Sequence, residues 1–149
     1  MRVVLQRVSS ASVAVDGAVT GAIAVGLYAL VGVGRASTED DARWLAAKTQ
    51  ALRVFSDARG LMNRSVEEAG GGVLAVSQFT LHADTSRGRR PSFLGAAEPE
   101  RARRLYEVYC DALTVPVGRG VFGAHMIIDA VLDGPVTLLL ERASGAGAA

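Results

Sequence analysis

The chain has few of the residues from which catalytic, metal and cross-linked sites are commonly built. Its 149 residues include one cysteine, two histidines and one tryptophan. A single cysteine excludes an intramolecular disulfide and suits a reducing compartment, so we expect a cytoplasmic protein. Neither a Cys-x-x-Cys nor a His-Glu-x-x-His motif occurs, which argues against a zinc site. We therefore expect no metal and no cofactor.

Long apolar runs and net charge are scarce as well. The apolar run at residues 25–31 is far shorter than the ~20 residues that a membrane span requires, so we expect no membrane partner. Residues 1–5 are strand-like and polar residues follow them, so no signal peptide is expected. The net charge of +1 gives no general attraction for nucleic acid. Half of the residues are hydrophobic, which indicates a globular chain of a length typical of one domain.

Periodicity along the chain predicts the element order β-β-β-α-β-α-β-β. Asp16-Gly17 is a strong hairpin signal, Thr38 and Asp41 are spaced as a helix-capping pair, and Pro99 fits the first position of a helix. The expected strands lie at about residues 8–15, 20–23, 27–33, 73–81, 126–132 and 136–141, and the helices begin near residues 38 and 99. The inward face of the first helix is expected to comprise Ala42, Leu45, Thr49, Leu52 and Phe55.

This order predicts an α+β fold, with one domain of mostly antiparallel, barrel-like β-sheets and two main helices packed against them. The last two strands are expected to form a hairpin around Asp133-Gly134-Pro135. We expect the domain to span residues 1–142 and residues 143–149 to form a flexible tail.

Two short segments, residues 77–80 and residues 134–137, carry the chemistry that the sequence offers. The second, Gly-Pro-Val-Thr, offers a Gly-Pro peptide that can be rigid and sometimes cis. Residues 77–80, Ser-Gln-Phe-Thr, end an apolar strand, and their N–H groups could stabilise an oxyanion without a protein nucleophile. The simpler alternative is that these residues are only the polar end of a core strand. A Ser77-His82-Asp84 triad is disfavoured, because alternation along a strand puts Ser77 and His82 on opposite faces and no Gly-x-Ser-x-Gly elbow occurs.

In order and spacing, seven motifs make the chain closely similar to the D-aminoacyl-tRNA deacylase family, from about residue 1 to residue 141. The motifs are Gln6–Val13, Leu52–Asp57, Met62–Ser65, Val76–Leu81, Arg90–Phe93, Phe122–Met126 and Asp133–Thr137. The chain departs from the family pattern at Leu132, where an Asn is usual, and His125 occupies a variable position.

The resemblance implies hydrolysis of the ester that joins a D-amino acid, or glycine on mischarged tRNA, to the terminal adenosine of tRNA. It implies a homodimer with its active sites at the subunit interface. Ser77, Gln78, Phe79 and Thr80 match the residues that hold the adenosine and the ester. Gly134 and Pro135 match a cis peptide that reaches in from the partner subunit and rejects L-residues. Arg7 matches the residue that braces this peptide, and Met126 matches a pocket-lining position.

Two catalytic routes stay open, and we favour the second. Thr80 could attack the ester, although no neighbouring base is evident, or the ribose 2′-hydroxyl of the tRNA could assist an attacking water. Three other functions also stay open: a tRNA-binding homologue without turnover, a related deacylase with a trans Gly-Pro peptide that accepts small L-residues, and a generic esterase. If this protein binds tRNA, Arg87, Arg89 and Arg90 could contact its phosphates.

Overall fold

The first strand organises the sheet. β1 (Arg2–Val15) pairs along one edge with β8 (Ile127–Glu141), and along the other edge with β3 (Gly26–Gly32) and then β2 (Ala18–Ile23), always antiparallel. β6 (Gly72–Ser77) and β7 (Val117–Arg119) extend the sheet beyond β3 in parallel. The computed structural model describes residues 1–143, so the expected tail lies outside the described residues from residue 144 onward.

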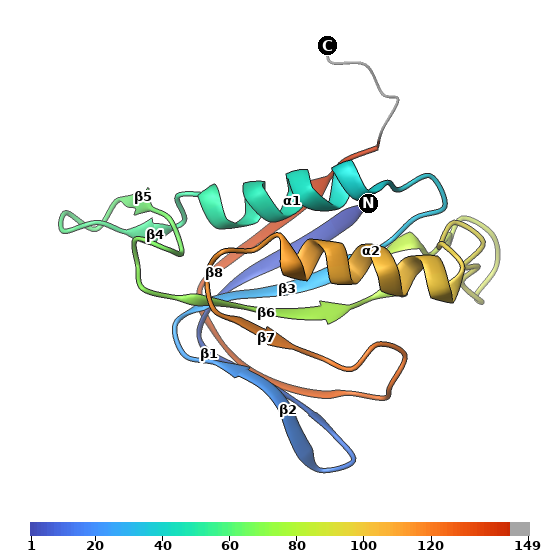
Figure 1. The fold of residues 1–149 in the computed structure, drawn as a ribbon, viewed down its shortest axis with the longest axis horizontal. Helices are drawn as coiled ribbons and strands as arrows, with labels where there is room; N and C mark the ends of the chain where they lie inside the picture. Colours follow the sequence, from blue (N-terminus) through green and yellow to red (C-terminus); the bar gives the residue numbers. More distant parts are fainter. Residues whose placement is uncertain (144–149) are drawn as a thin grey trace.

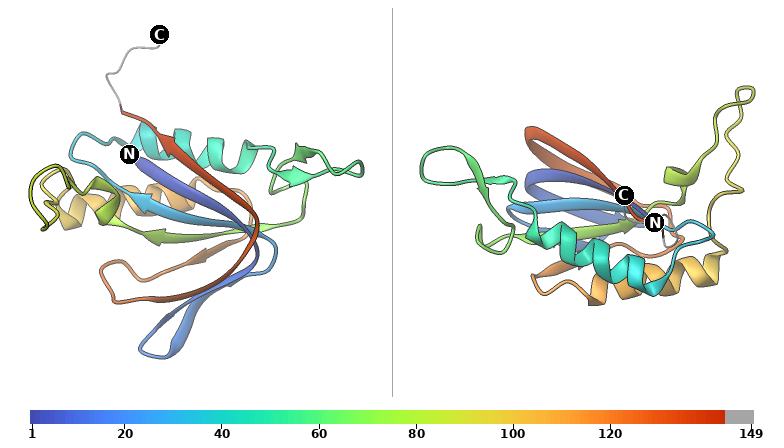
Figure 2. Two further views of the ribbon diagram at one scale, coloured as in Figure 1. Left: turned by 180° about the vertical axis from the view of Figure 1, so that it is seen from behind. Right: turned by 90° about the horizontal axis from the view of Figure 1, so that it is seen from above.

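The sheet curls until β2 comes close to β7, which nearly closes a barrel (Figure 1 and Figure 2, left). The Thr20 hydroxyl donates a hydrogen bond to the Arg119 carbonyl at 3.4 Å. A Cβ added to Gly21 would lie 2.6 Å from the Arg119 nitrogen, so only glycine permits this approach. The predicted single α+β domain, with mostly antiparallel, barrel-like sheets, is confirmed.

Two helices, α1 (Glu39–Ala51) and α2 (Pro99–Asp111), lie side by side on one face of the sheet (Figure 1 and Figure 2). The Tyr109 hydroxyl bonds the Thr49 hydroxyl at 2.9 Å between them, and the Tyr106 hydroxyl donates to the Ala75 carbonyl of β6 at 2.8 Å. The central strands β3 and β6 are buried on both faces, as their apolar sequences require. No helix within residues 1–143 has both the length and the hydropathy needed to cross a membrane.

Alternating side chains of the central strands divide the core into two parts. On β6, Val73 and Ala75 pack among the residues under the helices, whereas Leu74 and Val76 pack in the interior of the barrel. Because successive side chains of a strand point to opposite faces, one apolar run serves both layers. The central strand β6 is thus held rigidly, and it leads directly into residues 77–80.

Several local predictions are confirmed. Asp16 and Gly17 both have positive φ, of 49° and 82°, as a two-residue hairpin turn requires. Thr38 and Asp41 form a capping box, and Pro99 is the first residue of α2. These features depend on neighbouring residues alone, which is why the sequence signals them.

Other local predictions are wrong. Residues 126–141 do not form a hairpin, because β8 (Ile127–Glu141) pairs antiparallel with β1 on both sides of residues 133–136, which themselves have no partner on β1. The strand expected to reach residue 81 ends at Ser77, and Phe79–His82 form a 3-10 helix. α1 ends at Ala51, and Phe55 belongs to the short hairpin of β4 (Phe55–Ser56) and β5 (Met62–Arg64). The sheet is mostly antiparallel, as expected, and its two parallel pairs are β3–β6 and β6–β7.

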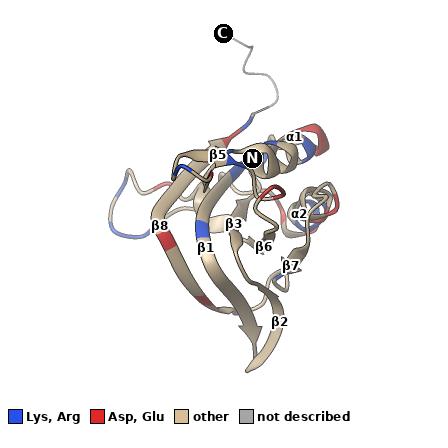
Figure 3. Cartoon of the chain, turned by 90° about the vertical axis from the view of Figure 1, so that its left-hand side faces the viewer, with Lys and Arg blue, Asp and Glu red and all other residues tan. Residues whose placement is uncertain are grey.

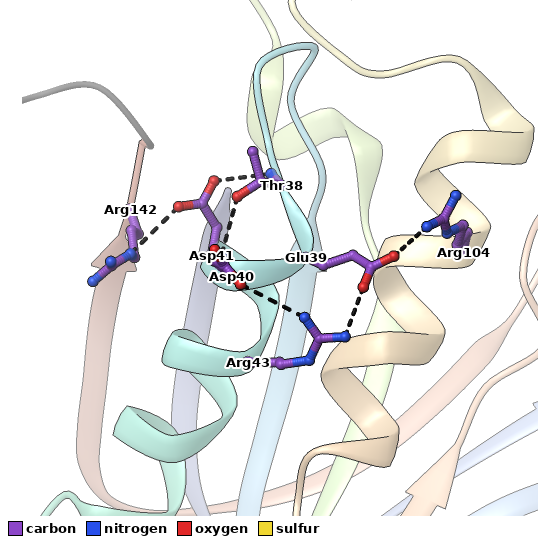
Figure 4. Close-up of polar contacts among 7 residues, drawn as sticks. All are labelled: Thr38, Glu39, Asp40, Asp41, Arg43, Arg104 and Arg142. Atoms are coloured by element: carbon purple, nitrogen blue, oxygen red, sulfur yellow. Dashed lines mark hydrogen bonds and ion pairs between the residues drawn. The ribbon is translucent and has the colours of Figure 1, made fainter.

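The start of α1 is tied to the end of β8 through a buried carboxylate (Figure 4). The Asp41 carboxylate is fully buried, accepts the Thr38 N–H at 2.9 Å and pairs with the Arg142 guanidinium at 3.4 Å. The neighbouring Asp40 carboxylate is 88% exposed and meets Arg43 at 3.6 Å. Two adjacent aspartates thus have opposite surroundings, one structural and one solvated.

We predict that Asp41→Ala lowers the free energy of unfolding by about 1–3 kcal/mol, because it removes a helix cap and leaves buried donors without this acceptor. Asp40→Ala is the matched control and should change it by no more than about 0.5 kcal/mol. Urea denaturation of both variants measures the difference. Equal losses would show that Asp41 has no special role.

Candidate functional site

The carboxyl ends of three strands meet at one edge of the sheet. β3, β6 and β7 run parallel, so the segments that follow them emerge together. Ligand sites form preferentially where the carboxyl ends of parallel strands leave such a crevice. Here the crevice is a cavity of about 280 Å³. Its lining includes Ser77, Gln78, Phe79, Phe122, His125 and Met126.

One wall of this cavity is the turn that follows β6. The Gln78 N–H donates to the Val31 carbonyl at 2.8 Å, which fixes the turn to the end of β3. A Cβ added to Gly32 would lie 3.0 Å from the Gln78 carbonyl oxygen and 2.8 Å from Leu81 Cβ, so the turn packs directly onto backbone. This tertiary contact turns the chain out of the strand before Phe79.

The turn leaves backbone donors at the mouth of the cavity. The first N–H groups of a helix have no acceptor within the helix, and here these belong to Phe79 and Thr80. Within residues 1–143 neither N–H group has a hydrogen-bond acceptor. The Gln78 N–H, by contrast, is engaged by Val31. Of the backbone N–H groups of this turn, those of Phe79 and Thr80 are therefore available to a ligand, and that of Gln78 is not.

No side chain of the turn has the surroundings of an activated nucleophile. The Thr80 hydroxyl accepts a hydrogen bond from Gln78 Nε2 at 2.6 Å, and within the described residues it bonds no imidazole or carboxylate. Thr80 is exposed, and it does not line the cavity, whereas Ser77, Gln78 and Phe79 do.

Burial raises the pKa of the Cys110 thiol to about 11, so that group stays protonated near neutral pH. In the described part of the chain, no three His, Cys, Asp or Glu side chains could together hold a metal ion.

A second cluster lies on the seam between β1 and β8. The Arg7 guanidinium donates to the Val54 carbonyl at 2.6 Å and to the Asp133 carbonyl at 3.2 Å. It also pairs with the Asp133 carboxylate at 3.1 Å, across the two strands. Figure 3 shows that β1 and β8, which carry basic and acidic residues, lie next to each other. The Gly134–Pro135 peptide that follows is cis and exposed. Arg7 therefore holds the backbone immediately before this peptide.

The two clusters are not brought together within one chain. Met126 lines the cavity beside Ser77 and Phe79, whereas Arg7, Gly134 and Pro135 do not. Among the described residues, β8 has β1 on one side and no strand on the other, so its far edge is open. Apolar side chains on β8 are exposed, with Val131 at 58% and Leu139 at 62%.

The three loop arginines lie apart from both clusters. Arg87, Arg89 and Arg90 are exposed on a loop that projects from the body of the molecule (Figure 2, right). Its two ends are joined by backbone hydrogen bonds of 2.7 and 2.9 Å between Asp84 and Ser92. None of the three arginines lines the cavity.

Sequence reasoning missed the opposite wall of the cavity. Ala102 of α2 and Phe122 of the loop after β7 both line it, and Arg103 lies over the Phe122 ring with Cζ 5.2 Å from the centroid. Phe122 belongs to a motif that the sequence analysis recognised, but the motif gives no partner. The contact with α2 joins residues about twenty positions apart, and no local pattern signals it.

The family model and two curated relatives that match this chain all carry the name of a tRNA deacylase. The family model described as D-Tyr-tRNA(Tyr) deacylase matches residues 4–141. The chain is 58% identical over 144 residues to a D-aminoacyl-tRNA deacylase of Deinococcus radiodurans, covering 95% of this chain and 99% of that protein. It is 57% identical over 145 residues to a D-aminoacyl-tRNA deacylase of Opitutus terrae, covering 95% and 97%.

Two solved structures share the fold. One is named a c-Myc DNA unwinding element binding protein, with a TM-score of 0.90, 35% identity, and coverage of 97% of this chain and 100% of that one. The other is named a probable eukaryotic D-amino acid tRNA deacylase, with a TM-score of 0.75 and 18% identity, covering 93% and 97%. At that identity the second comparison supports the fold alone.

The 3-10 turn contains a histidine that favours its neutral form. His82 Nε2 is buried and has no hydrogen-bond partner within residues 1–143, and a Cβ added to Gly34 would lie 2.8 Å from the ring. Burial lowers the pKa of His82 below its ordinary value of 6.5, against the opposing effect of its hydrogen bond to the Gly32 backbone. As pH falls below 6.5, the unfolded chain therefore takes up this proton before the folded one.

We predict that the free energy of unfolding falls between about pH 7.5 and about pH 5.5, and that His82→Gln reduces this dependence. The stability due to the lowered pKa is fully present above the unfolded value and is lost on acidification. Denaturation curves of both proteins at the two pH values measure the effect. An unchanged pH dependence in the variant would assign it to other groups.

Proposed function

The chain belongs to the D-aminoacyl-tRNA deacylase family and is a hydrolase, and from this premise we propose what it hydrolyses and how. The proposed substrate is tRNA that carries a D-amino acid, or glycine on a mischarged tRNA. The products are the free amino acid and the intact tRNA. The proposal rests on one observation, a cavity with backbone donors at its mouth and no nucleophile paired with a base.

We place the terminal adenosine and its ester in the cavity beside Ser77, Gln78 and Phe79. The Phe79 ring is 56% exposed and available to a nucleobase, and Met126 lines the same space. The N–H groups of Phe79 and Thr80 would face the ester carbonyl. Donors fixed in advance stabilise a developing oxyanion without reorganising during the reaction.

Selection of handedness is assigned to the Gly134–Pro135 segment of a second copy. In its own chain this segment does not line the cavity, and it stands on a strand whose far edge is open among residues 1–143. Exposed Val131, Leu132 and Leu139 give that strand an apolar surface suited to a homodimer interface. Two copies related by two-fold symmetry would each supply the other's cavity.

Main-chain carbonyl groups are suited to selecting the handedness of the amino acid. D-residues differ in side-chain size and charge, but they share the directions of the ammonium, the hydrogen and the ester carbon at Cα. Fixed carbonyl oxygens can accept the ammonium while the D side chain points outward. An L side chain would collide with the same wall, so selectivity comes from a penalty against the wrong enantiomer. Glycine has no side chain to reject.

Arg7 would keep that wall in place. Its guanidinium is only 12% exposed and contacts both the Asp133 backbone and the Asp133 carboxylate. Arg7 therefore acts as a positioning residue, which holds the approach to Gly134 without touching the reacting atoms. Leu132, where the family usually has Asn, lies on the exposed side of β8 and does not contribute to these contacts.

For the chemical step we favour assistance by the substrate. Water attacks the ester carbonyl carbon, the negative charge develops on the former carbonyl oxygen, and the ribose oxygen leaves with a proton. The neighbouring 2′-hydroxyl can orient the water and relay the proton. Thr80 is the less suitable nucleophile, because its hydroxyl accepts from Gln78 and has no base to remove its proton.

We predict that the purified protein hydrolyses D-tyrosyl-tRNA at least ~100-fold faster than L-tyrosyl-tRNA, a difference of about 2.7 kcal/mol in activation free energy. Release of labelled tyrosine measures both rates, and sedimentation of the same preparation should give the mass of a dimer. Binding of tRNA without turnover would instead favour a nucleic-acid-binding role, which the name of the 35% identical protein suggests for that relative. Hydrolysis of both enantiomers at similar rates would remove the selective wall.

We also predict that Thr80→Ala keeps its rate on normal D-tyrosyl-tRNA within about tenfold, whereas wild type loses about 10²- to 10⁴-fold on tRNA that ends in 2′-deoxyadenosine. The reason is that the assisting hydroxyl belongs to the substrate. Single-turnover rates at saturating enzyme compare the two directly. An inactive variant beside normal turnover of the deoxy substrate would make Thr80 the nucleophile.

A further inference from the structure

A second, larger hollow adjoins the cavity. This groove has a volume of about 610 Å³ and shares Phe79, Ala102 and Phe122 with the cavity as a common wall. Its outer part is formed by Phe93 and Leu94 from the segment that precedes α2. A ligand that fills the cavity can therefore continue into the groove without crossing another element.

The groove presents exposed apolar surface where a flat ring could lie. Phe79 and Phe93 meet edge to face, with ring centroids 4.9 Å apart and an interplanar angle of 71°. Phe93 is 36% exposed and Leu94 is 72% exposed. Stacking on exposed aromatic side chains is how proteins commonly hold the bases of single-stranded nucleic acid.

The charged residues in and near the groove nearly balance within the lining. Arg35 and Glu98 both line the groove, so the lining itself is close to neutral. Arg103 lies over the Phe122 ring at the boundary with the cavity. The loop of Arg87, Arg89 and Arg90 begins at the Asp84–Ser92 bridge, directly before Phe93. A mostly apolar lining with one residue of each charge, and with Arg103 next to the shared wall, suits a base whose phosphates remain in solvent.

We propose that this groove holds the base of the nucleotide that precedes the terminal adenosine, which is a cytidine in tRNA. The inference rests on the proposed function, because it takes the aminoacylated adenosine to occupy the cavity. The preceding nucleotide must then leave the cavity along a continuous surface, and the shared Phe79 wall provides that path. The groove thereby extends recognition from one nucleoside to a dinucleotide.

The test compares three esters: D-tyrosyl-adenosine, D-tyrosyl-cytidylyl-adenosine, and the same dinucleotide with an abasic first ribose. Wild type should have a kcat/KM about 5- to 100-fold higher for the intact dinucleotide than for the abasic one, mainly through KM. Phe93→Leu and Leu94→Ala should each reduce this ratio severalfold and leave hydrolysis of D-tyrosyl-adenosine unchanged. Leu61→Ala is the control, since Leu61 is 58% exposed and lies outside the groove, and it should change neither.

Two outcomes would overturn the dinucleotide proposal, and a third would overturn the proposed function. If Phe93→Leu and Leu94→Ala lower kcat/KM equally for all three esters, the groove holds the terminal adenine and the proposal is overturned. Unchanged ratios in both groove variants would overturn it as well. If wild type hydrolyses none of the D-esters, the proposed function itself fails, which differs from either outcome because no variant is needed to see it.

Discussion

The pairing of β1 with β8 on both sides of residues 133–136 is the constraint on which the rest of the structure depends. It places Arg7 opposite the approach to Gly134, and it carries the Gly134–Pro135 peptide along the outside of the sheet. The same pairing leaves the other edge of β8 open among the described residues. One seam thus fixes the bracing contact and the exposure of the segment that we assign to a second copy.

The failure of the expected hairpin shows how such a seam overrides local signals. Asp133-Gly134-Pro135 reads as a turn, because glycine and proline there are typical of hairpin tips. Antiparallel pairing of β8 with β1 on both sides of this segment accommodates it instead, with register shifts between Gln6 and Val8 and between Val8 and Ser10. The hairpin predicted from this local signal is wrong, because pairing with the distant strand β1 determines the form of the segment.

The candidate site divides in the same way. Residues 77–79 could be found from the sequence, because a polar segment that ends an apolar strand is visible locally. The end of the strand at Ser77 could not be predicted from the sequence, because it depends on Gly32 of β3, which leaves room for the Gln78 carbonyl. The wall from Ala102 and Phe122 was equally hidden, because it forms only when α2 packs over β6.

These contacts also explain why a site without a nucleophile can be selective. In the function that we propose, the donors fixed by β3 and β6 lower the barrier for an ester that is already placed. Placement then falls to rigid elements: the Phe79 turn held by Val31, and the segment held by Arg7. Because both are held through backbone groups, side-chain variation in the substrate has little to act on. In the function that we propose, selectivity is therefore a property of how firmly two segments of main chain are fixed, more than of any one functional group.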